Sequence, residues 1–191
     1  MSLARTSKTM TVAAVALLAS LVAFGNITDY GTNLAFVQHV LRMDTIFPNA
    51  TIKYRAIDNP MLQQAAYVLI IATELLTAFV CWIGAFRLMR HRRGDARGFN
   101  RAKGTAVVGL TLGFLVWQVG FMSIGGEWFG MWMSKEWNGV PSAFRFLMTI
   151  LGVLIYVSLP DSDAPEAGSG QPLDRTTPAR IERGQDGLDE D

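Results

Sequence analysis

The chain has 191 residues, of which 50% are hydrophobic, and its formal net charge is only +1. This total combines two unlike parts: the first 159 residues carry fourteen Lys or Arg against seven Asp or Glu, and the remainder carries three Arg against nine acidic residues. A single cysteine excludes an intramolecular disulfide and a thiolate metal cluster.

Four apolar segments are each long enough to cross a hydrocarbon core of about 30 Å as a helix. They cover residues 9–27, 61–86, 104–124 and 141–159. A chain of this size is too short to surround four such helices in water. The sequence therefore predicts an all-α integral membrane protein, with a four-helix transmembrane bundle in residues 1–159 and structured external loops.

The first span has an alternative interpretation as a cleaved signal peptide. Arg5 and Lys8 precede it, and the small residues Ala23 and Gly25 lie near its end. Cleavage would leave three spans. We keep the four-span prediction because the apolar stretch is long and the residues after it are patterned like a structured segment.

Basic residues gather in the predicted loop between the second and third spans. They are Arg87, Arg90, Arg92, Arg93, Arg97, Arg101 and Lys103. Because Lys and Arg are enriched in cytoplasmic loops, this loop and both termini are predicted to be cytoplasmic. We expect no nucleic-acid binding, since nothing around the loop supplies a stacking surface or a suitable fold.

Two segments on the other side of the membrane have patterns of their own. Leu34, Val37 and Leu41 share one helical face, which predicts a short amphipathic helix. Residues 125–139 are rich in aromatic side chains, namely Trp128, Phe129, Trp132 and Trp137. Tryptophan favours the headgroup region, so an interfacial segment is expected, with a groove for a lipid, quinone or partner subunit as the alternative.

Three polar residues lie inside predicted spans. Counted from the predicted cytoplasmic helix ends, Glu74 lies roughly 18 Å deep, and Gln118 and Arg145 each roughly 21 Å. Buried charge is tolerated when it is paired, so the spacing predicts a polar cluster of these three side chains, serving as a structural clasp or as a proton- or ligand-handling site. Two alternatives are that Arg145 extends to the headgroups and that Glu74 is neutral and unpaired.

No catalytic constellation is recognisable. The two histidines, His39 and His91, are predicted on opposite sides of the membrane, where they cannot share a haem or metal. No phosphate-binding loop, nucleophile elbow or zinc-protease motif occurs. We therefore predict no enzyme activity, no cofactor and no metal site.

Residues 160–191 are rich in proline, glycine and acidic residues and lack aromatic side chains. Such a segment cannot bury enough apolar surface to offset its chain entropy, so it is predicted to be a disordered cytoplasmic tail. It is either solvated or docked on the basic loop.

Three stretches resemble a known family. They are ITDYGTNLAFVQHVLRMDTIFP, TELLTA around Glu74, and GGEWFGMWMSKEWNG followed by AFRF. Together they are similar to an uncharacterised bacterial family of predicted small integral membrane proteins. The resemblance implies a multi-pass, four-helix protein of the bacterial inner (plasma) membrane and favours an uncleaved first helix. It implies no activity and no role for Glu74.

Two functional hypotheses follow. In the first, the protein is an accessory or scaffold subunit in the lipid bilayer that binds a membrane partner. In the second, it is a small transporter or channel-like homo-oligomer whose polar core holds Glu74, Gln118 and Arg145. A water-filled cavity that reaches Glu74 would favour the second hypothesis, and a dry, closed triad would count against it.

Overall fold

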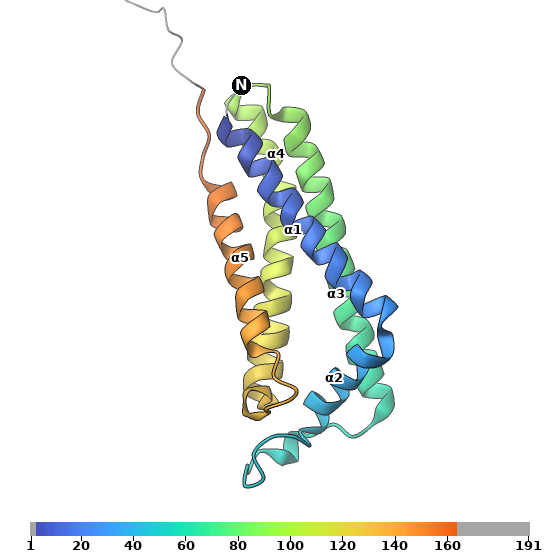
Figure 1. The fold of residues 1–191 in the computed structure, drawn as a ribbon. Coiled ribbons are helices and arrows are strands. Elements are labelled where there is room, and N and C mark those ends of the chain that lie inside the picture. Colours follow the sequence, from blue (N-terminus) through green and yellow to red (C-terminus); the bar gives the residue numbers. More distant parts are fainter. Residues whose placement is uncertain (1–2, 164–191) are drawn as a thin grey trace, which may run out of the picture.

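The computed structural model describes residues 3–163, which are helical apart from short connections (Figure 1). The long helices are α1 (Leu3–Thr28), α3 (Pro60–His91), α4 (Ala96–Leu115), which continues directly into a π-helix, η2 (Val116–Trp128), and α5 (Val140–Ser158). In this part of the chain four helices are long and apolar enough to span a membrane. The predicted all-α membrane bundle is thereby confirmed.

The bundle has two unlike ends. The amino-terminal end holds the start of α1, the α3–α4 loop and the end of α5 (Figure 1). The opposite end, called here the loop end, holds α2 (Tyr30–Arg42) and the short 3₁₀ turns η1 (Lys53–Arg55) and η3 (Met131–Met133). The predicted amphipathic helix is confirmed as α2, whose Val37 and Leu41 are buried against Tyr67 and Ile71 of α3.

Helix α3 begins at Pro60, directly after the loop, and Asn59 caps its first turn. The Asn59 side chain accepts a hydrogen bond from the Met61 backbone N–H at 2.9 Å, and Pro60 occupies the first helical turn, where its missing N–H costs nothing. The helix then continues to His91, beyond the predicted end at Phe86. The apolar run ends there, but nothing that breaks a helix occurs before Gly94.

Small residues bring α3 and α4 into close contact in the amino-terminal half of the bundle. A Cβ atom added to Gly84 would lie 2.6 Å from the Cα of Ala106, and one added to Gly109 would lie 2.8 Å from the backbone nitrogen of Cys81. Such close approach is typical of helix packing in membranes. This half is therefore densely packed, and Leu88 has no exposed surface.

The helices separate toward the loop end. Helix α1 crosses α3 diagonally, and α5 with η2 stands apart from the corner formed by α1, α2 and α3 (Figure 1). In η2 the backbone hydrogen bonds skip one residue more than in an α-helix, as in the bond from the Phe129 N–H to the Ile124 carbonyl at 3.0 Å. π-helical turns are frequent at functional sites, and η2 forms one wall of the site described next.

Candidate functional site

The buried carboxylate of Glu74 lies where α1 and α3 cross. Its side chain is on α3 and is 1% exposed. Asn26, near the end of α1, donates from Nδ2 to Glu74 Oε2 at 2.7 Å, and the Asn26 carbonyl accepts from the Tyr67 hydroxyl at 2.7 Å. Glu74 Oε1 has no hydrogen-bond partner among the described residues. A buried acceptor in that state costs on the order of 1–3 kcal/mol, and a donor that reached this oxygen would remove that cost.

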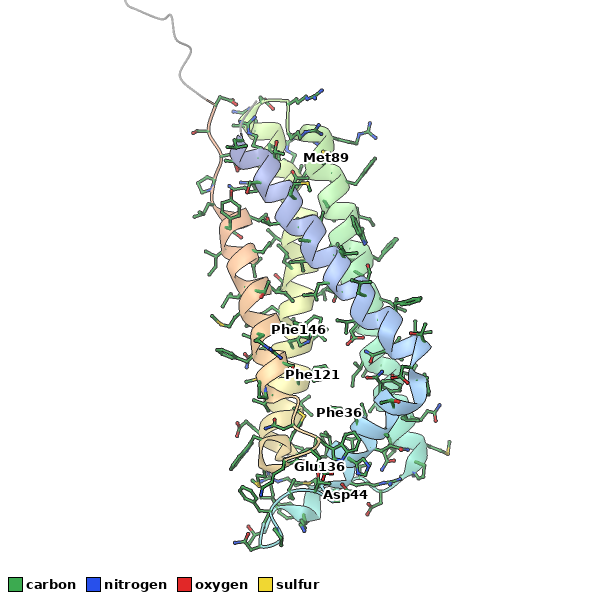
Figure 2. All side chains as sticks on the ribbon, in the orientation of Figure 1. Phe36, Asp44, Met89, Phe121, Glu136 and Phe146 are labelled. Atoms are coloured by element: carbon green, nitrogen blue, oxygen red, sulfur yellow. The ribbon has the colours of Figure 1, made fainter. Side chains whose placement is uncertain are left out.

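A cavity of about 300 Å³ reaches Glu74. Its walls come from α1, α2, α3, η2, α5 and the loop before α5: Val22, Asn26, Asn33, Phe36, Val37, Tyr67, Ile70, Glu74, Trp117, Phe121, Asn138, Gly139, Ser142, Ala143 and Phe146. Figure 2 labels three of its aromatic walls, Phe36 of α2, Phe121 of η2 and Phe146 of α5. The volume is at the lower end of the range typical of small-molecule sites.

Polar groups are distributed unevenly in this cavity. Asn33 and the exposed Asn138 lie toward the loop end, and Glu74 with Asn26 lies at the inner end. A ligand that enters past Asn138 would therefore meet Glu74 as the only carboxylate in the cavity wall.

Arg145 does not pair with Glu74, which corrects the predicted triad. It lies in the second turn of α5, is exposed, and donates to the Ser142 hydroxyl at 2.9 Å. It lies five positions after Val140, where α5 starts, so it is only roughly 8 Å from that helix end. The alternative in which its guanidinium extends toward the surface describes this geometry.

Gln118 does not join Glu74 either. Its side chain is half-buried on η2 and is absent from the cavity wall, which the neighbouring Trp117 occupies instead. Trp117 lies four positions after the buried Gly113 and seven after the buried Leu110, so helical spacing turns Trp117 inward and Gln118 away from the cavity. The depth of Gln118 was counted from Gly104, although α4 starts at Ala96, and that of Glu74 from Phe86, although α3 extends to His91.

Sequence reasoning missed three of the polar residues at this site. Asn26 stands at the end of the first apolar run and was interpreted only as a boundary. Asn33 belongs to α2 and Asn138 to the loop before α5, and both approach Glu74 only through the tertiary fold. Tyr67 had a detectable signal, because it stands seven residues before Glu74 and so on the same face of α3.

The predicted aromatic segment covers the loop end. Trp128 and Trp132 are about half exposed, at 53% and 46%, whereas Phe129 is buried. Trp137 stacks on His39, with ring centroids 4.4 Å apart. Exposed tryptophan rings at this level fit a membrane interface, and the stacked pair connects α2 to the loop before α5.

A family model described as "Predicted small integral membrane protein (DUF2165)" matches residues 4–160. The chain belongs to this family. No match was found among curated proteins or among solved structures. The matched range contains every residue of the Glu74 cavity wall and ends just before Asp161 and Asp163.

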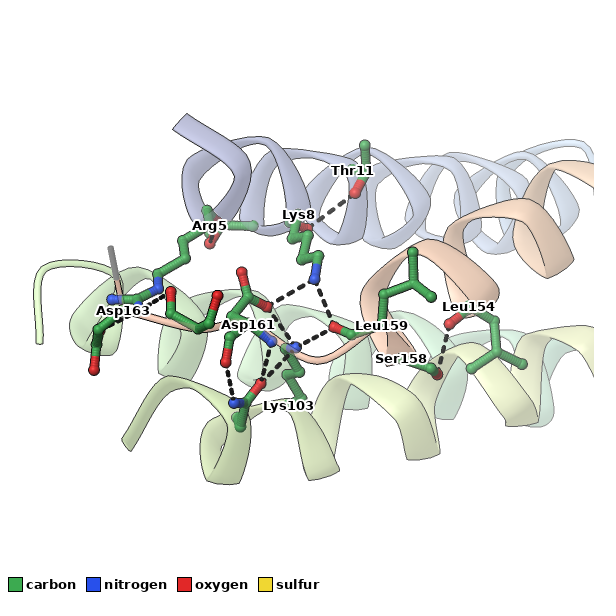
Figure 3. Close-up of polar contacts among 12 residues, drawn as sticks. Arg5, Lys8, Thr11, Lys103, Leu154, Ser158, Leu159, Asp161 and Asp163 are labelled. Carbon is green, nitrogen blue, oxygen red and sulfur yellow. Dashed lines mark hydrogen bonds and ion pairs between the residues drawn. The ribbon is translucent and has the colours of Figure 1, made fainter. Parts of the chain in front are cut away.

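The structure has a second polar feature at the amino-terminal end of the bundle. We call it the ionic clasp, and it consists of Arg5, Lys8, Lys103, Asp161 and Asp163 (Figure 3). Lys8 and Lys103 both bind Oδ2 of Asp161, the former at 2.7 Å, and both donate to the Leu159 carbonyl. Arg5 pairs with Asp163 at 2.7 Å and donates to the Gly94 carbonyl at 2.6 Å. The clasp therefore fixes α1, α4 and the chain after α5 to one another.

The environment of Asp161 favours its charged form. Burial alone would raise the pKa of this carboxyl, but hydrogen bonds and charge from Lys103 and Lys8 outweigh burial and hold the pKa below its usual value of 3.8. Its side chain is only 6% exposed. The carboxylate and two lysines thus form a buried charged group in which every member has a partner.

The clasp revises two predictions. Lys103, predicted as part of the exposed basic loop, is buried in α4, whereas Arg87, Arg90, Arg93, Arg97 and Arg101 are exposed as expected and Arg92 is half-buried. The predicted disordered tail begins at Pro160, but Asp161 and Asp163 are held by the clasp. The rest of that tail, from residue 164, lies outside the described residues.

Proposed function

We propose that the protein binds a small molecule with a positively charged or strongly hydrogen-bond-donating group in the Glu74 cavity. The observation that carries this proposal is the unpartnered Oε1 of a carboxylate that is 1% exposed and forms part of a cavity wall. No described cation pairs with this carboxylate. An ammonium group of a ligand would supply both the missing donor and the missing charge.

The packing of the other half supports a binding site that is closed toward the amino-terminal end. From Glu74 toward the amino-terminal end, α3 meets α4 through the Gly84–Ala106 and Cys81–Gly109 contacts, and the ionic clasp covers the end itself. A continuous channel would have to open these contacts. We therefore place the ligand in a cavity that is closed at the amino-terminal end, and we propose binding without a catalytic step.

The charge distribution supports an orientation for this site. The exposed arginines at the end of α3, in the following loop and at the start of α4 lie at the amino-terminal end, which by the positive-inside rule is the cytoplasmic one. The cavity would then open toward the outer face of a bacterial inner membrane. The other hypothesis, an accessory subunit that binds a membrane partner, stays a prediction, and its test is a mild-detergent pull-down with mass spectrometry.

The binding proposal is tested by titrating benzylammonium, a small aromatic cation, into the purified protein in nanodiscs. Charge-assisted hydrogen bonds contribute about 1.5–3 kcal/mol, so Glu74→Gln is expected to weaken binding by about tenfold or more. The matched control is Glu127→Gln, which removes an exposed carboxylate from η2 and should leave the affinity unchanged. Equal affinity in wild type and Glu74→Gln would overturn the proposal, as would an equal loss in both variants.

A further inference from the structure

Two apolar hollows adjoin the Glu74 cavity. A second hollow of about 210 Å³ lies between α2, α3 and η2 and shares the walls Phe36, Val37, Ile70 and Phe121 with the cavity. A third, of about 360 Å³, runs along α3 beside α4 and η2 and again includes Ile70 and Phe121. We call the second and third hollows together the side groove.

The side groove differs from the cavity in chemistry. Every side chain lining the second hollow is apolar. The third has two hydroxyls, of Thr73 and Thr77, but both donate to backbone carbonyls of α3. The polar site at Glu74 and the apolar groove therefore adjoin across Ile70 and Phe121.

Gly120 lies at the junction of the two parts of the side groove and lines both. A Cβ atom added there would meet nothing within 4 Å, so the missing side chain leaves open space rather than permitting close helix packing. Contrast Gly109, where the added atom would meet the backbone of α3 at 2.8 Å. The groove is thus unfilled at this point by any atom of the described chain.

The groove opens to the lipid-facing surface of the bundle. Leu69 on one wall is 64% exposed, and Ile124 on the other is 48% exposed. An unfilled apolar channel forfeits the dispersion contacts that its walls could make, so a chain of methylene groups is the natural occupant. The membrane is the source of such chains.

We propose that the ligand is a single-chain amphiphile with an ammonium headgroup. The inference rests on the binding site proposed above and specifies its ligand class. The headgroup donates to Glu74 Oε1, and the alkyl chain passes between Ile70 and Phe121 into the side groove, past Gly120. One molecule then satisfies the unpartnered oxygen and fills the apolar space beside it.

The test compares two amines that differ in their chains, benzylammonium and dodecylammonium, in nanodiscs. Gly120→Leu fills the side groove without reaching Glu74, so it should weaken dodecylammonium binding by about tenfold, or about 1.4 kcal/mol, and leave benzylammonium binding unchanged. Gly152→Leu is the matched control, because Gly152 of α5 is exposed and its added Cβ also meets nothing within 4 Å. It should change neither affinity.

The outcomes separate this inference from the proposed function. If Gly120→Leu binds dodecylammonium as the wild type does while Glu74→Gln weakens both amines, the chain placement is overturned and the Glu74 site stands. If Glu74→Gln binds both amines as the wild type does, both proposals fail. Retained benzylammonium binding also shows that the Gly120→Leu variant is folded.

A second measurement needs no variant. Dodecylammonium with a diazirine at its chain end is photocrosslinked to the wild-type protein, and the labelled peptide is identified by mass spectrometry. Labelling of residues 69–77 of α3 or 112–124 of α4 and η2 is expected. Labelling confined to α1 or α5 would overturn the chain placement.

Discussion

Asn26 and Glu74, 48 residues apart in the chain, form a hydrogen bond of 2.7 Å that joins the end of α1 to the middle of α3. The bond uses one carboxylate oxygen and leaves the other facing no protein donor in the described structure. The pair thus combines a structural contact with an unused acceptor, and the two roles are separable by mutation.

Because Asn26 and Glu74 are hydrogen-bonded, substitutions at the two positions should change the free energy of unfolding non-additively. Asn26→Val removes the donor to Glu74 and is expected to cost about 1–3 kcal/mol in unfolding free energy, because both buried oxygens then lack partners. Adding Glu74→Leu replaces the second partner as well and should recover most of the loss. Thermal unfolding in detergent measures both variants. A double variant no more stable than Asn26→Val would contradict this account.

Arg145 and Glu74 should be energetically independent. Since Arg145 is exposed and bonded to Ser142, the effects of Arg145→Gln and Glu74→Gln on stability are expected to add within about 0.5 kcal/mol. A double-mutant cycle on thermal unfolding provides the measurement. A coupling energy well above that value would restore the triad predicted from the sequence.

The ionic clasp predicts acid sensitivity. Pairing holds the pKa of Asp161 below 3.8, so the folded protein binds this proton less tightly than the unfolded chain does. The stability that this carboxylate contributes is therefore fully present above about pH 4 and is lost as the pH falls through its lowered pKa. Unfolding temperatures measured between pH 3 and pH 7 should show a loss confined to the acidic end.

Asp161→Asn should reproduce that loss at neutral pH. Removing one member of a buried ion pair costs about 3–5 kcal/mol, and here two buried lysines would lose their partner. Asp163→Asn is the matched control, because its carboxylate is 59% exposed and the expected effect is smaller. Equal effects of the two substitutions would show that burial at Asp161 does not matter.

The close contact between α3 and α4 predicts intolerance of a single methyl group. Gly84→Ala would place Cβ 2.6 Å from the Ala106 backbone, so the helices must shift, at a cost of about 1–3 kcal/mol. Gly152→Ala, where the added atom meets nothing within 4 Å, should be tolerated. Thermal unfolding distinguishes them, and an unchanged midpoint for Gly84→Ala would contradict the packing described here.

The sequence predicted the parts of the fold that depend on local pattern. Runs of apolar residues located the four spans, and the spacing of Leu34, Val37 and Leu41 located α2. The sequence did not predict which side chains contact one another, because those contacts depend on how each helix is rotated about its axis and on which helices lie beside it. Trp117 rather than Gln118 lies in the cavity wall, and in sequence the π-helical segment η2 looks like any other apolar run.

Counting charged residues along the sequence likewise did not predict which of them are buried. Lys103 was grouped with the loop arginines because it follows them closely in sequence. Its burial depends on Asp161, a residue 58 positions later that sequence reasoning assigned to the tail. Likewise, depth counting placed Arg145 near Glu74 because it assumed that helix ends lie level, and α3 and α5 differ by 13 residues in length (32 and 19).

The central claim is that Glu74 receives a ligand's donor group, and infrared difference spectroscopy tests it most directly. Adding benzylammonium to the protein in nanodiscs should shift a glutamate carboxyl band in the wild type, and this shift should be absent in Glu74→Gln and retained in Glu127→Gln. A spectrum without any carboxyl change on saturation, or the same change in Glu74→Gln, would contradict the claim.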